Sequence, residues 1–433
     1  MAVAHPPYRG PLAQLFQLDP QLVRCPYRAY ARARDQPPVW VDRLNAYVVT
    51  RYDDVVTVLR DPEISSSGMA SGPASVTPLA RKISEDPAAS DRLRRQVQRR
   101  LQISRSAVLL TADPPDHVRQ RKLVNKGFTA RRIAELEKDV EAIAQELVDG
   151  FPDDGRVDLV TDFAIKLPMT VIANILGVPK SMMDAFKWWS DSFTAGTGNL
   201  NLSNTELEDM FNAVDQFYDY FTEQVADRRD NPADDLLTDL VKARLDGEKP
   251  LALDEILQML VQFLTAGNET TTNLIASIVH MLVTDGALMA RMRAEPEGIR
   301  ALVEEVLRLE SPVQGLFRTA TRDVEVGGTA MPTGSMLWLV YGSANRDPAG
   351  FPAGDSMSLE EALTRQHLAF GKGEHYCLGA PLARMEARIG TAVLLSRLDR
   401  IELACDEADV AYLPNFVLHG IKSLPLAVRK AAT

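Results

Sequence analysis

Cysteine is scarce in this sequence, which has only Cys25, Cys377 and Cys405 among its 433 residues. Three scattered cysteines cannot build a disulfide scaffold, and so small a number fits a reducing compartment. The first ten residues contain no continuous apolar run, which argues against a signal peptide or a membrane anchor. A net charge of −11 argues against broad nucleic-acid binding. Together these absences predict a cytoplasmic protein that binds neither nucleic acid nor membrane.

Long Pro-, Gly- or Ser-rich linkers are also lacking, so nothing divides the chain into separately patterned parts. The composition, 45% hydrophobic and 25% charged, is that of an ordinary globular protein. We therefore expect one large domain over residues 1–433. Residues 65–78 are low in complexity, and we expect them to be mobile.

A glycine-rich stretch, residues 370–380, presents one cysteine just ahead of an amphipathic helix. The free N–H groups and positive dipole end of that helix favour the thiolate of Cys377, which is then a nucleophile, a redox group or a metal ligand. A lone cysteine is more often a small buried hydrophobe. Gly371 and Gly373 permit a tight turn, and Gly379 leaves room for a large flat cofactor beside the sulfur.

Residues 254–284 form the longest helical pattern, and it is apolar nearly all round. Such a pattern predicts a helix buried in a large protein, with a membrane span as the alternative. Glu269 is its only charged residue between Glu255 and Asp285. A carboxylate is costly to bury without a function. Ala266 and Gly267 add small residues before it.

Other pairs at helical spacing are weaker signals. His117 and Arg121 lie four residues apart, and Glu305 and Arg308 lie three apart, as many structural pairs do. Residues 91–101 predict a helix with an apolar face and five arginines around it. These arginines indicate either a solvated surface or a cationic lid that attracts an acidic substrate.

Short elements are predicted elsewhere from local patterns. Strands at 324–326 and 336–340, with glycine turns between them, predict one small antiparallel sheet. Further expected elements are helices at Tyr27–Arg34 and Tyr52–Arg60, strands at 39–41 and 46–50, and a C-terminal hairpin with its turn at 416–418.

Four strings in order carry a specific resemblance. They are Asp-Pro-Pro-x-His-x-x-x-Arg at 113–121, Ala-Gly-x-Glu-Thr-Thr at 266–271, Glu-x-x-Arg at 305–308 and Phe-Gly-x-Gly-x-His-x-Cys-x-Gly at 370–379. This set resembles the cytochrome P450 family of haem-thiolate monooxygenases, and the matches extend from about residue 25 to residue 425.

The resemblance implies a mainly α fold with small antiparallel β-sheets, a helix-rich triangular prism. Haem b (iron protoporphyrin IX) would lie between the long central helix and the Cys-loop helix. Cys377 would be the metal ligand, Glu269 and Thr270 the proton relay, and Glu305 with Arg308 the structural frame. The other implied haem-binding residues are His117, Arg121, Ala266, Gly267, Arg318, Phe370, Gly371, His375 and Gly379, with His117, Arg121, Arg318 and His375 on the propionates.

The implied activity is insertion of one atom of dioxygen into a hydrophobic fatty acid, terpenoid, steroid or polyketide. The chain carries no flavin- or nucleotide-binding segment, so electrons would come from a ferredoxin or flavodoxin with its NAD(P)H reductase. A basic face formed by Arg119, Lys122, Lys126, Arg131, Arg132, Lys372, Arg384 and Arg388 would receive that partner. A peroxide-driven peroxygenase and a non-catalytic haem sensor are the alternatives. We expect a monomer.

One position departs from the family pattern. Relatives carry an arginine that completes the Glu-x-x-Arg frame, but Ala362 stands near its place, and Arg365 is the nearest candidate. The expected substrate-facing residues are apolar: Leu264, Val313, Leu316, Phe416 and Val417. The arginine-rich helix slightly favours an acidic substrate.

Overall fold

The computed structural model describes residues 10, 12–61, 65–67, 77–87, 89–195 and 204–432. Close contacts group the chain into two units. The first comprises Met1–Ser66, Leu136–Pro168 and Thr270–Thr433, and the second comprises Ser67–Glu135 and Met169–Glu269. The single domain over residues 1–433 stays a prediction. Residues 68–76 of the stretch predicted to be mobile lie outside the described residues.

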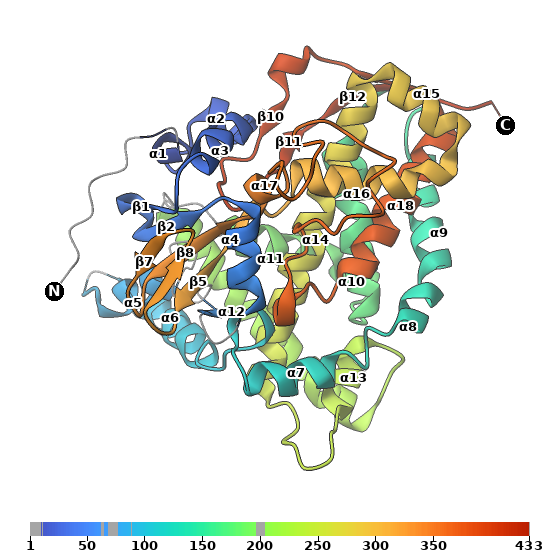
Figure 1. Cartoon of the computed structure of the whole chain (residues 1–433). Coiled ribbons are helices and arrows are strands. Elements are labelled where there is room, and N and C mark those ends of the chain that lie inside the picture. Colours follow the sequence, from blue (N-terminus) through green and yellow to red (C-terminus); the bar gives the residue numbers. More distant parts are fainter. Residues whose placement is uncertain are drawn as a thin grey trace. The chain divides into compact units, whose positions relative to one another are not determined.

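Helices dominate both units (Figure 1). The helices of the first unit are α1 (Leu12–Leu15), α2 (Pro20–Arg24), α3 (Tyr27–Arg34), α4 (Tyr52–Arg60), α9 (Glu137–Asp149), α15 (Gly286–Ala294), α16 (Ile299–Glu310), α17 (Tyr341–Ala344) and α18 (Ala380–Arg397). Those of the second unit are α5 (Thr77–Glu85), α6 (Asp91–Ile103), α7 (Asp116–Val124), α8 (Ala130–Glu135), α11 (Met183–Ala195), α12 (Asn204–Asp230) and α13 (Leu236–Lys242). Helices α10 (Lys166–Ile175) and α14 (Leu253–Thr284) contribute to both units.

The largest sheet has the strand order β1-β2-β8-β5-β3. Its strands are β1 (Val39–Val41), β2 (Ala46–Val49), β3 (Ser65–Ser67), β5 (Gly315–Ala320) and β8 (Met336–Val340). Strand β8 pairs antiparallel with β5 and parallel with β2, with Trp338 opposite Phe317 and Val48. The sheet is therefore mixed, whereas the sequence predicted only antiparallel sheets.

The predicted pairing of residues 324–326 with 336–340 is wrong. Strand β6 (Val324–Val326) instead forms a hairpin with β7 (Thr329–Met331) across Gly327 and Gly328, both of which have positive φ. Strand β8 then continues into the large sheet. Because neighbouring strands in a sheet can come from distant parts of the chain, turn signals alone did not reveal this pairing.

Helix α4 covers part of this sheet and keeps the ends predicted for it. Val55, Val58 and Leu59 form one buried face that packs against Leu337 and Leu339 of β8. Two aspartates in its first turn complement the helix dipole. The local signals were therefore sufficient to place this helix.

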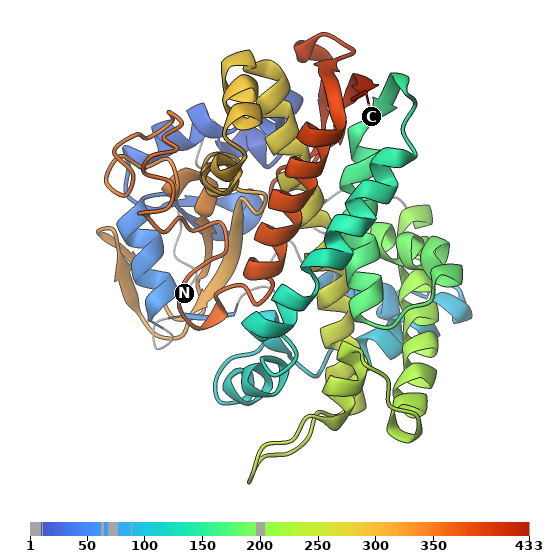
Figure 2. The same ribbon diagram turned by 90° about the vertical axis from the view of Figure 1, so that its right-hand side faces the viewer.

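The C-terminal part of the first unit holds a second, antiparallel sheet of order β4-β12-β9. Its strands are β4 (Asp154–Asp158), β9 (Leu398–Leu403) and β12 (Pro425–Lys430), and β10 (Ala411–Tyr412) pairs with β11 (Ile421–Ser423) beside them. Helix α18 leads into β9 and packs against α9 and α16 (Figure 2). This packing holds the helix that follows Cys377.

One hydrophobic cluster of the second unit lies between α5, α6 and α12. Val97 of α6 packs with Ala80, Leu207, Met210 and Phe211. An aromatic cluster of Trp189, Phe193, Phe217 and Phe221 joins α11 to α12 through ring centroids 4.5–6.4 Å apart.

Helix α14 runs without interruption over the range predicted for it. No single helix of the described chain is long and apolar enough to cross a membrane, and α14 with α15, which bend by 108° at their junction, meet that requirement only when counted together.

Candidate active site

A tightly closed loop carries Cys377. Its backbone hydrogen bonds run from the N–H of Gly371 to Leu368 O (2.8 Å), from Tyr376 to Gly373 O (3.1 Å) and from Cys377 to Phe370 O (3.0 Å). Gly371 and Gly373 have φ of 69° and 74°, a region in which residues with side chains are strained. A Cβ at Gly373 would also clash with the carbonyl oxygen of Leu59. The glycines are therefore required by the shape of the loop.

Cys377 lies two residues before Gly379, the N-cap of α18, and Pro381 occupies the first turn. This is the position predicted at a helix N-terminus. The nearest described heavy atom to a Cβ built on Gly379 would be Cys377 Sγ, at 4.0 Å. Glycine therefore keeps this side of the partly exposed sulfur clear of a side chain.

The base of the loop is held by Glu304 of α16. Arg384 of α18 donates to it through Nε (2.6 Å) and Nη2 (2.9 Å), and His367 Nε2 lies 3.2 Å away. Arg384 also donates to Tyr376 Oη and stacks 4.5 Å from the Phe370 ring centroid. Burial would raise the pKa of Glu304, but the His367 and Arg384 hydrogen bonds lower it to about 2. No local spacing in the sequence links the members of this cluster, so the sequence does not predict it.

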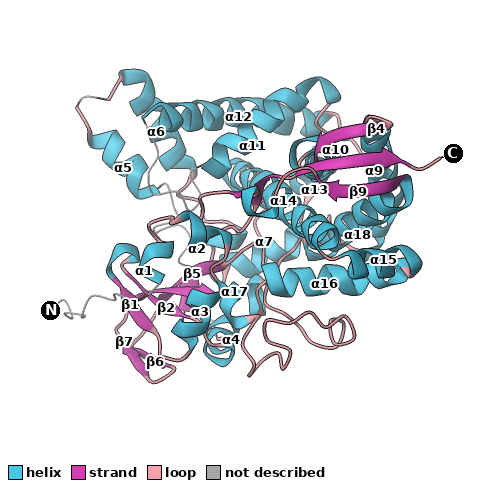
Figure 3. Ribbon diagram, turned by 90° about the horizontal axis from the view of Figure 1, so that it is seen from above, coloured by secondary structure: helices cyan, strands magenta, loops and turns pink. Residues whose placement is uncertain are grey.

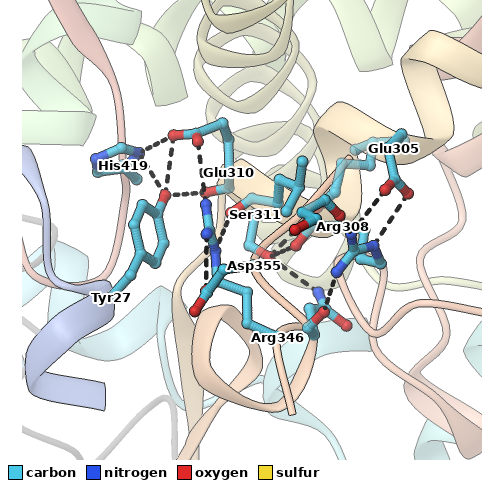
Figure 4. A network of polar contacts seen from close by, with 12 residues as sticks. Tyr27, Glu305, Arg308, Glu310, Ser311, Arg346, Asp355 and His419 are labelled. Atoms are coloured by element: carbon cyan, nitrogen blue, oxygen red, sulfur yellow. Dashed lines mark hydrogen bonds and ion pairs between the residues drawn. The ribbon is translucent and has the colours of Figure 1, made fainter. Parts of the chain in front are cut away.

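The predicted Glu305–Arg308 frame is present and buried, with 2% and 4% of the two residues exposed (Figure 4). Arg308 donates to both carboxylate oxygens of Glu305, at 2.6 and 3.0 Å. Its other hydrogen bonds go to the carbonyl oxygens of Asn345, Gly354 and Ser356. All of these acceptors lie in the first unit.

Backbone groups replace the arginine that the family usually places in this frame. The N–H of Ser358 donates to Glu305 Oε1 at 2.7 Å, while Arg365 is exposed and donates to Gly350 O instead. Ala362 is buried and lines the same small hollow as Glu305 and Arg308. Arg365 therefore does not complete the frame.

Glu310 organises a second buried network on the same helix (Figure 4). Its carboxylate contacts Tyr27 Oη at 2.9 Å, His419 Nδ1 at 3.3 Å and Arg346 Nη2 at 3.3 Å. Burial would raise the pKa of Glu310, but His419, Arg346 and Tyr27 lower it to about 2. This network ties the C-terminal segment to α16 and was also missed.

The middle of α14 has a less buried face. Ala266 is exposed, and Gly267, Glu269 and Thr270 are partly exposed, whereas the opposite residue Leu264 is fully buried. A Cβ on Gly267 would make only an ordinary contact of 3.7 Å with Ile172. Small side chains at 266 and 267 therefore leave this face open to a large group.

Glu269 faces a polar pair on α11. Burial raises the pKa of its carboxyl, Asp191 raises it further, and Lys187 lowers it. Lys187 Nζ lies 2.5 Å from Asp191 Oδ2. Glu269 is thus an acid whose neutral form is favoured by its surroundings, as a residue that holds and releases a proton requires.

The predicted propionate partners fall in both units. In the second unit, His117 is buried and Arg121 is partly exposed, one turn apart on α7. In the first unit, His375 lies 3.6 Å from Glu374, and Arg318 of β5 is only 4% exposed. Among described residues, the Arg318 guanidinium has no carboxylate partner and donates only to the carbonyl of Phe317.

The apolar residues predicted to face substrate differ in exposure. Val313 and Leu316 are partly exposed, next to the hydrophobic cluster under the large sheet. Phe416 is buried between the edges of Phe16 and Trp338, and the carbonyl of Val417 accepts from the N–H of Gln314. The predicted turn is therefore packed against β5 and β8.

The donor set fits haem b. In the first unit, a cysteine sulfur is presented beside a bare glycine, and a buried guanidinium lacks an anion that a propionate would supply. In the second unit, α14 exposes a face of small residues. Each feature suits a large, flat, dianionic ligand with a metal that accepts thiolate.

Comparison with known proteins agrees with this chemistry. The Cytochrome P450 family matches residues 51–408. "Cytochrome P450 107B1" of Saccharopolyspora erythraea is 34% identical over 96% of this chain and 98% of its own length, and the "6-deoxyerythronolide B hydroxylase" of the same organism is 33% identical over 92% and 95%. The structure of "P450BioI in complex with hexadec-9Z-enoic acid ligated Acyl Carrier Protein" matches with a TM-score of 0.82 at 28% identity, over 95% of this chain and 99% of that chain. This chain therefore belongs to the cytochrome P450 family and is a monooxygenase with haem b as its cofactor.

Proposed function

We propose that this P450 hydroxylates a hydrophobic small molecule, with Cys377 as the axial ligand of its haem. The observation that carries this assignment is the loop that presents Cys377 Sγ at the N-terminus of α18 beside Gly379. A thiolate is stabilised there by the free N–H groups of the first turn. His117, Arg121, Arg318 and His375 would hold the propionates, and Phe370, Gly371, Ala266 and Gly267 would line the ring.

When bound, the haem supplies the activation of dioxygen, which the thiolate favours by donating electron density. Glu269 and Thr270 supply protons in our proposal. The raised pKa of the Glu269 carboxyl supports this, because an acid with a pKa nearer to neutral transfers protons more effectively. The Thr270 hydroxyl is adjacent in sequence and would pass the proton on through ordered water.

The substrate in this proposal is apolar, of the fatty acid, terpenoid, steroid or polyketide type. Val313 and Leu316 support it best, because their side chains are apolar and partly exposed. Phe416 and Val417 are buried and would shape the pocket from behind, and Leu264, on the other side of α14 from Ala266, would support the helix. The fatty acyl chain named for the P450BioI structure shows that a relative accepts such a chain.

Turnover under isotopically labelled dioxygen tests the function. The purified haem protein, supplied with a ferredoxin, its reductase and NADPH, should convert at least one of dodecanoic acid, a steroid, a monoterpene or a macrolactone. The product should contain one labelled oxygen atom. Oxygen taken from added peroxide, with no turnover under dioxygen and reductant, would instead identify a peroxygenase. Haem spectral responses without any oxygenated product would identify a sensor.

An acidic ferredoxin is the partner that we propose for electron delivery. In the structure, several of the basic side chains predicted to contact the ferredoxin are already paired with carboxylates. Arg119 forms an ion pair with Glu255, Arg132 with Asp239, Arg384 with Glu304 and Arg388 with Glu137. Lys122 is exposed and makes no ion pair with any described residue, so it is a candidate for contact with the ferredoxin.

Charge reversal of Lys122 should therefore slow reduction. We expect Lys122→Glu to lower the rate of reduction by an acidic ferredoxin about tenfold at low salt, because electrostatic steering raises association rates. The difference should shrink at high salt. Stopped-flow reduction measures both effects. Lys180→Glu, an exposed lysine on another segment of the second unit, is the matched control. Equal rates for all three proteins at low salt would refute this role for Lys122.

A further inference from the structure

Glu304 and Arg384 form a shielded ion pair beside the cysteine loop. The helices that carry them, α16 and α18, lie side by side (Figure 3). The guanidinium donates two short hydrogen bonds to the carboxylate, and the two side chains are 14% and 31% exposed. Apart from this pair, only His367 lies within ion-pair distance of either side chain among the described residues. The two charges therefore cancel each other locally.

The hydrogen bonds of His367 show which of its ring nitrogens carries a proton. Nδ1 accepts from the N–H of Ala369 at 3.2 Å, so this nitrogen is unprotonated. Nε2 lies 3.2 Å from Glu304 Oε2, which only accepts, so the proton is on Nε2. The ring is therefore neutral, a tautomer assigned from its partners. Since His367 adds no charge, the cluster of Glu304, His367 and Arg384 has no net charge.

Arg384 joins this cluster to the cysteine loop at two points. Its guanidinium carbon lies 4.5 Å from the centroid of the Phe370 ring, and its Nη1 donates to Tyr376 Oη at 3.1 Å. The carbonyl of Phe370 accepts the N–H of Cys377 at 3.0 Å, and Tyr376 directly precedes Cys377 in the chain. The guanidinium therefore contacts both the residue that is hydrogen-bonded to Cys377 and the residue that is covalently next to it.

We propose that Glu304 sets the redox equilibrium of the haem by neutralising Arg384 and holding it against the cysteine loop. The inference rests on the proposed function, in which Cys377 binds the iron and a ferredoxin supplies the electron. Reduction from ferric to ferrous adds one negative charge, so an uncompensated cation nearby favours the ferrous state and an uncompensated carboxylate favours the ferric state. Glu304 is thus a positioning residue that acts through Arg384.

Spectroelectrochemical titration of the haem-loaded protein tests this proposal. We expect Glu304→Gln to raise the equilibrium constant for one-electron reduction about tenfold, a shift of about 59 mV, because Arg384 keeps its charge. Arg384→Gln should lower the constant by a similar factor, and the double variant, which has no net charge change, should return close to wild type. Glu137→Gln is the matched control. Glu137 pairs with Arg388 one turn further along α18, where the two side chains are 48% and 40% exposed, so we expect a change below about twofold.

The signs of the shifts separate a charge effect from a loss of packing. An unchanged potential in Glu304→Gln, or shifts of the same sign in both single variants, would overturn the proposal. A double variant no closer to wild type than the single variants, or an equal shift in Glu137→Gln, would also overturn it. If Glu304→Gln failed to bind haem, the sign of the shift in Arg384→Gln would still decide. Each protein is first checked for the thiolate-type spectrum of the reduced carbon monoxide complex, so a wrong assignment of the iron ligand is distinguishable from failure of this redox role.

Discussion

Cys377→Ala is expected to abolish the thiolate-type spectrum of the reduced carbon monoxide complex and to reduce hydroxylation to background. The sulfur at the N-terminus of α18 has no substitute nearby in the chain. Cys25 is exposed between α2 and α3, and Cys405 follows β9. Alanine retains the main-chain hydrogen bonds that close the loop, among them the bond from the N–H of residue 377 to Phe370 O. The loss should therefore reflect ligation rather than misfolding.

Cys405→Ala is the matched control for this experiment. It removes a partly buried cysteine of the same unit that is remote in sequence from the loop, so the variant should keep both spectrum and turnover. A Cys377→Ala protein that retained the thiolate-type spectrum would refute our assignment of the ligand. A Cys405→Ala protein that lost it would do the same, because the ligand would then lie elsewhere.

Glu386→Gln is expected to remove a large pH dependence of stability. Glu386 lies on α18 with 2% of its surface exposed, and its Oε2 accepts no hydrogen bond in the described chain. Burial raises the pKa of this carboxyl to about 8, from 4.5 when it is solvated. The folded protein therefore holds this proton over a pH range in which the unfolded chain has released it.

The direction of the effect follows from proton linkage. The stabilising contribution of the protonated Glu386 carboxyl is fully present below about pH 4.5 and is lost as pH rises through about 8. The shift corresponds to at most about 5 kcal/mol at 1.36 kcal/mol per pKa unit. Glutamine keeps the shape but cannot ionise. The free energy of unfolding of the variant should match that of wild type near pH 5 and exceed it by about 3 kcal/mol near pH 9.

Unfolding midpoints of the haem-loaded proteins at pH 5, 7 and 9 measure this difference. Glu325→Gln changes an exposed residue of strand β6, so it makes the same chemical change where no buried charge is involved, and it should follow the wild-type pH profile. If wild type and Glu386→Gln lost stability equally above pH 7, ionisation of the Glu386 carboxyl would not be the cause of the pH dependence of stability.

Local sequence signals were enough for several of the helices and for the glycine loop that carries Cys377. Helices α3 and α4 begin and end at the residues that the local sequence pattern predicted. Helix α14 was visible as a long apolar pattern with one acid. The Cys377 loop was visible because its glycines must adopt positive φ within a few residues of the cysteine. These features depend on residues that are close together in the chain, so they can be recognised in the sequence.

Long-range partners could not be predicted in the same way. The parallel pairing of β2 with β8 joins strands nearly 300 positions apart. Arg384 and Arg119 read as members of a basic face, yet each is held by a glutamate on another helix. The missing frame arginine is replaced by backbone groups of residues 345–358, whose positions no side-chain pattern reveals.

The amino-acid sequence by itself determined the family, the cofactor and the cysteine proposed to bind iron, because a loop motif and a helix with one acid encode them over short spans. Only the tertiary structure determined which charged side chains form ion pairs within the protein. Burial and pairing depend on what packs against a side chain. The ion pair of Arg384, the lack of a carboxylate partner for Arg318 among the described residues and the unsatisfied carboxyl oxygen of Glu386 are therefore visible only in three dimensions.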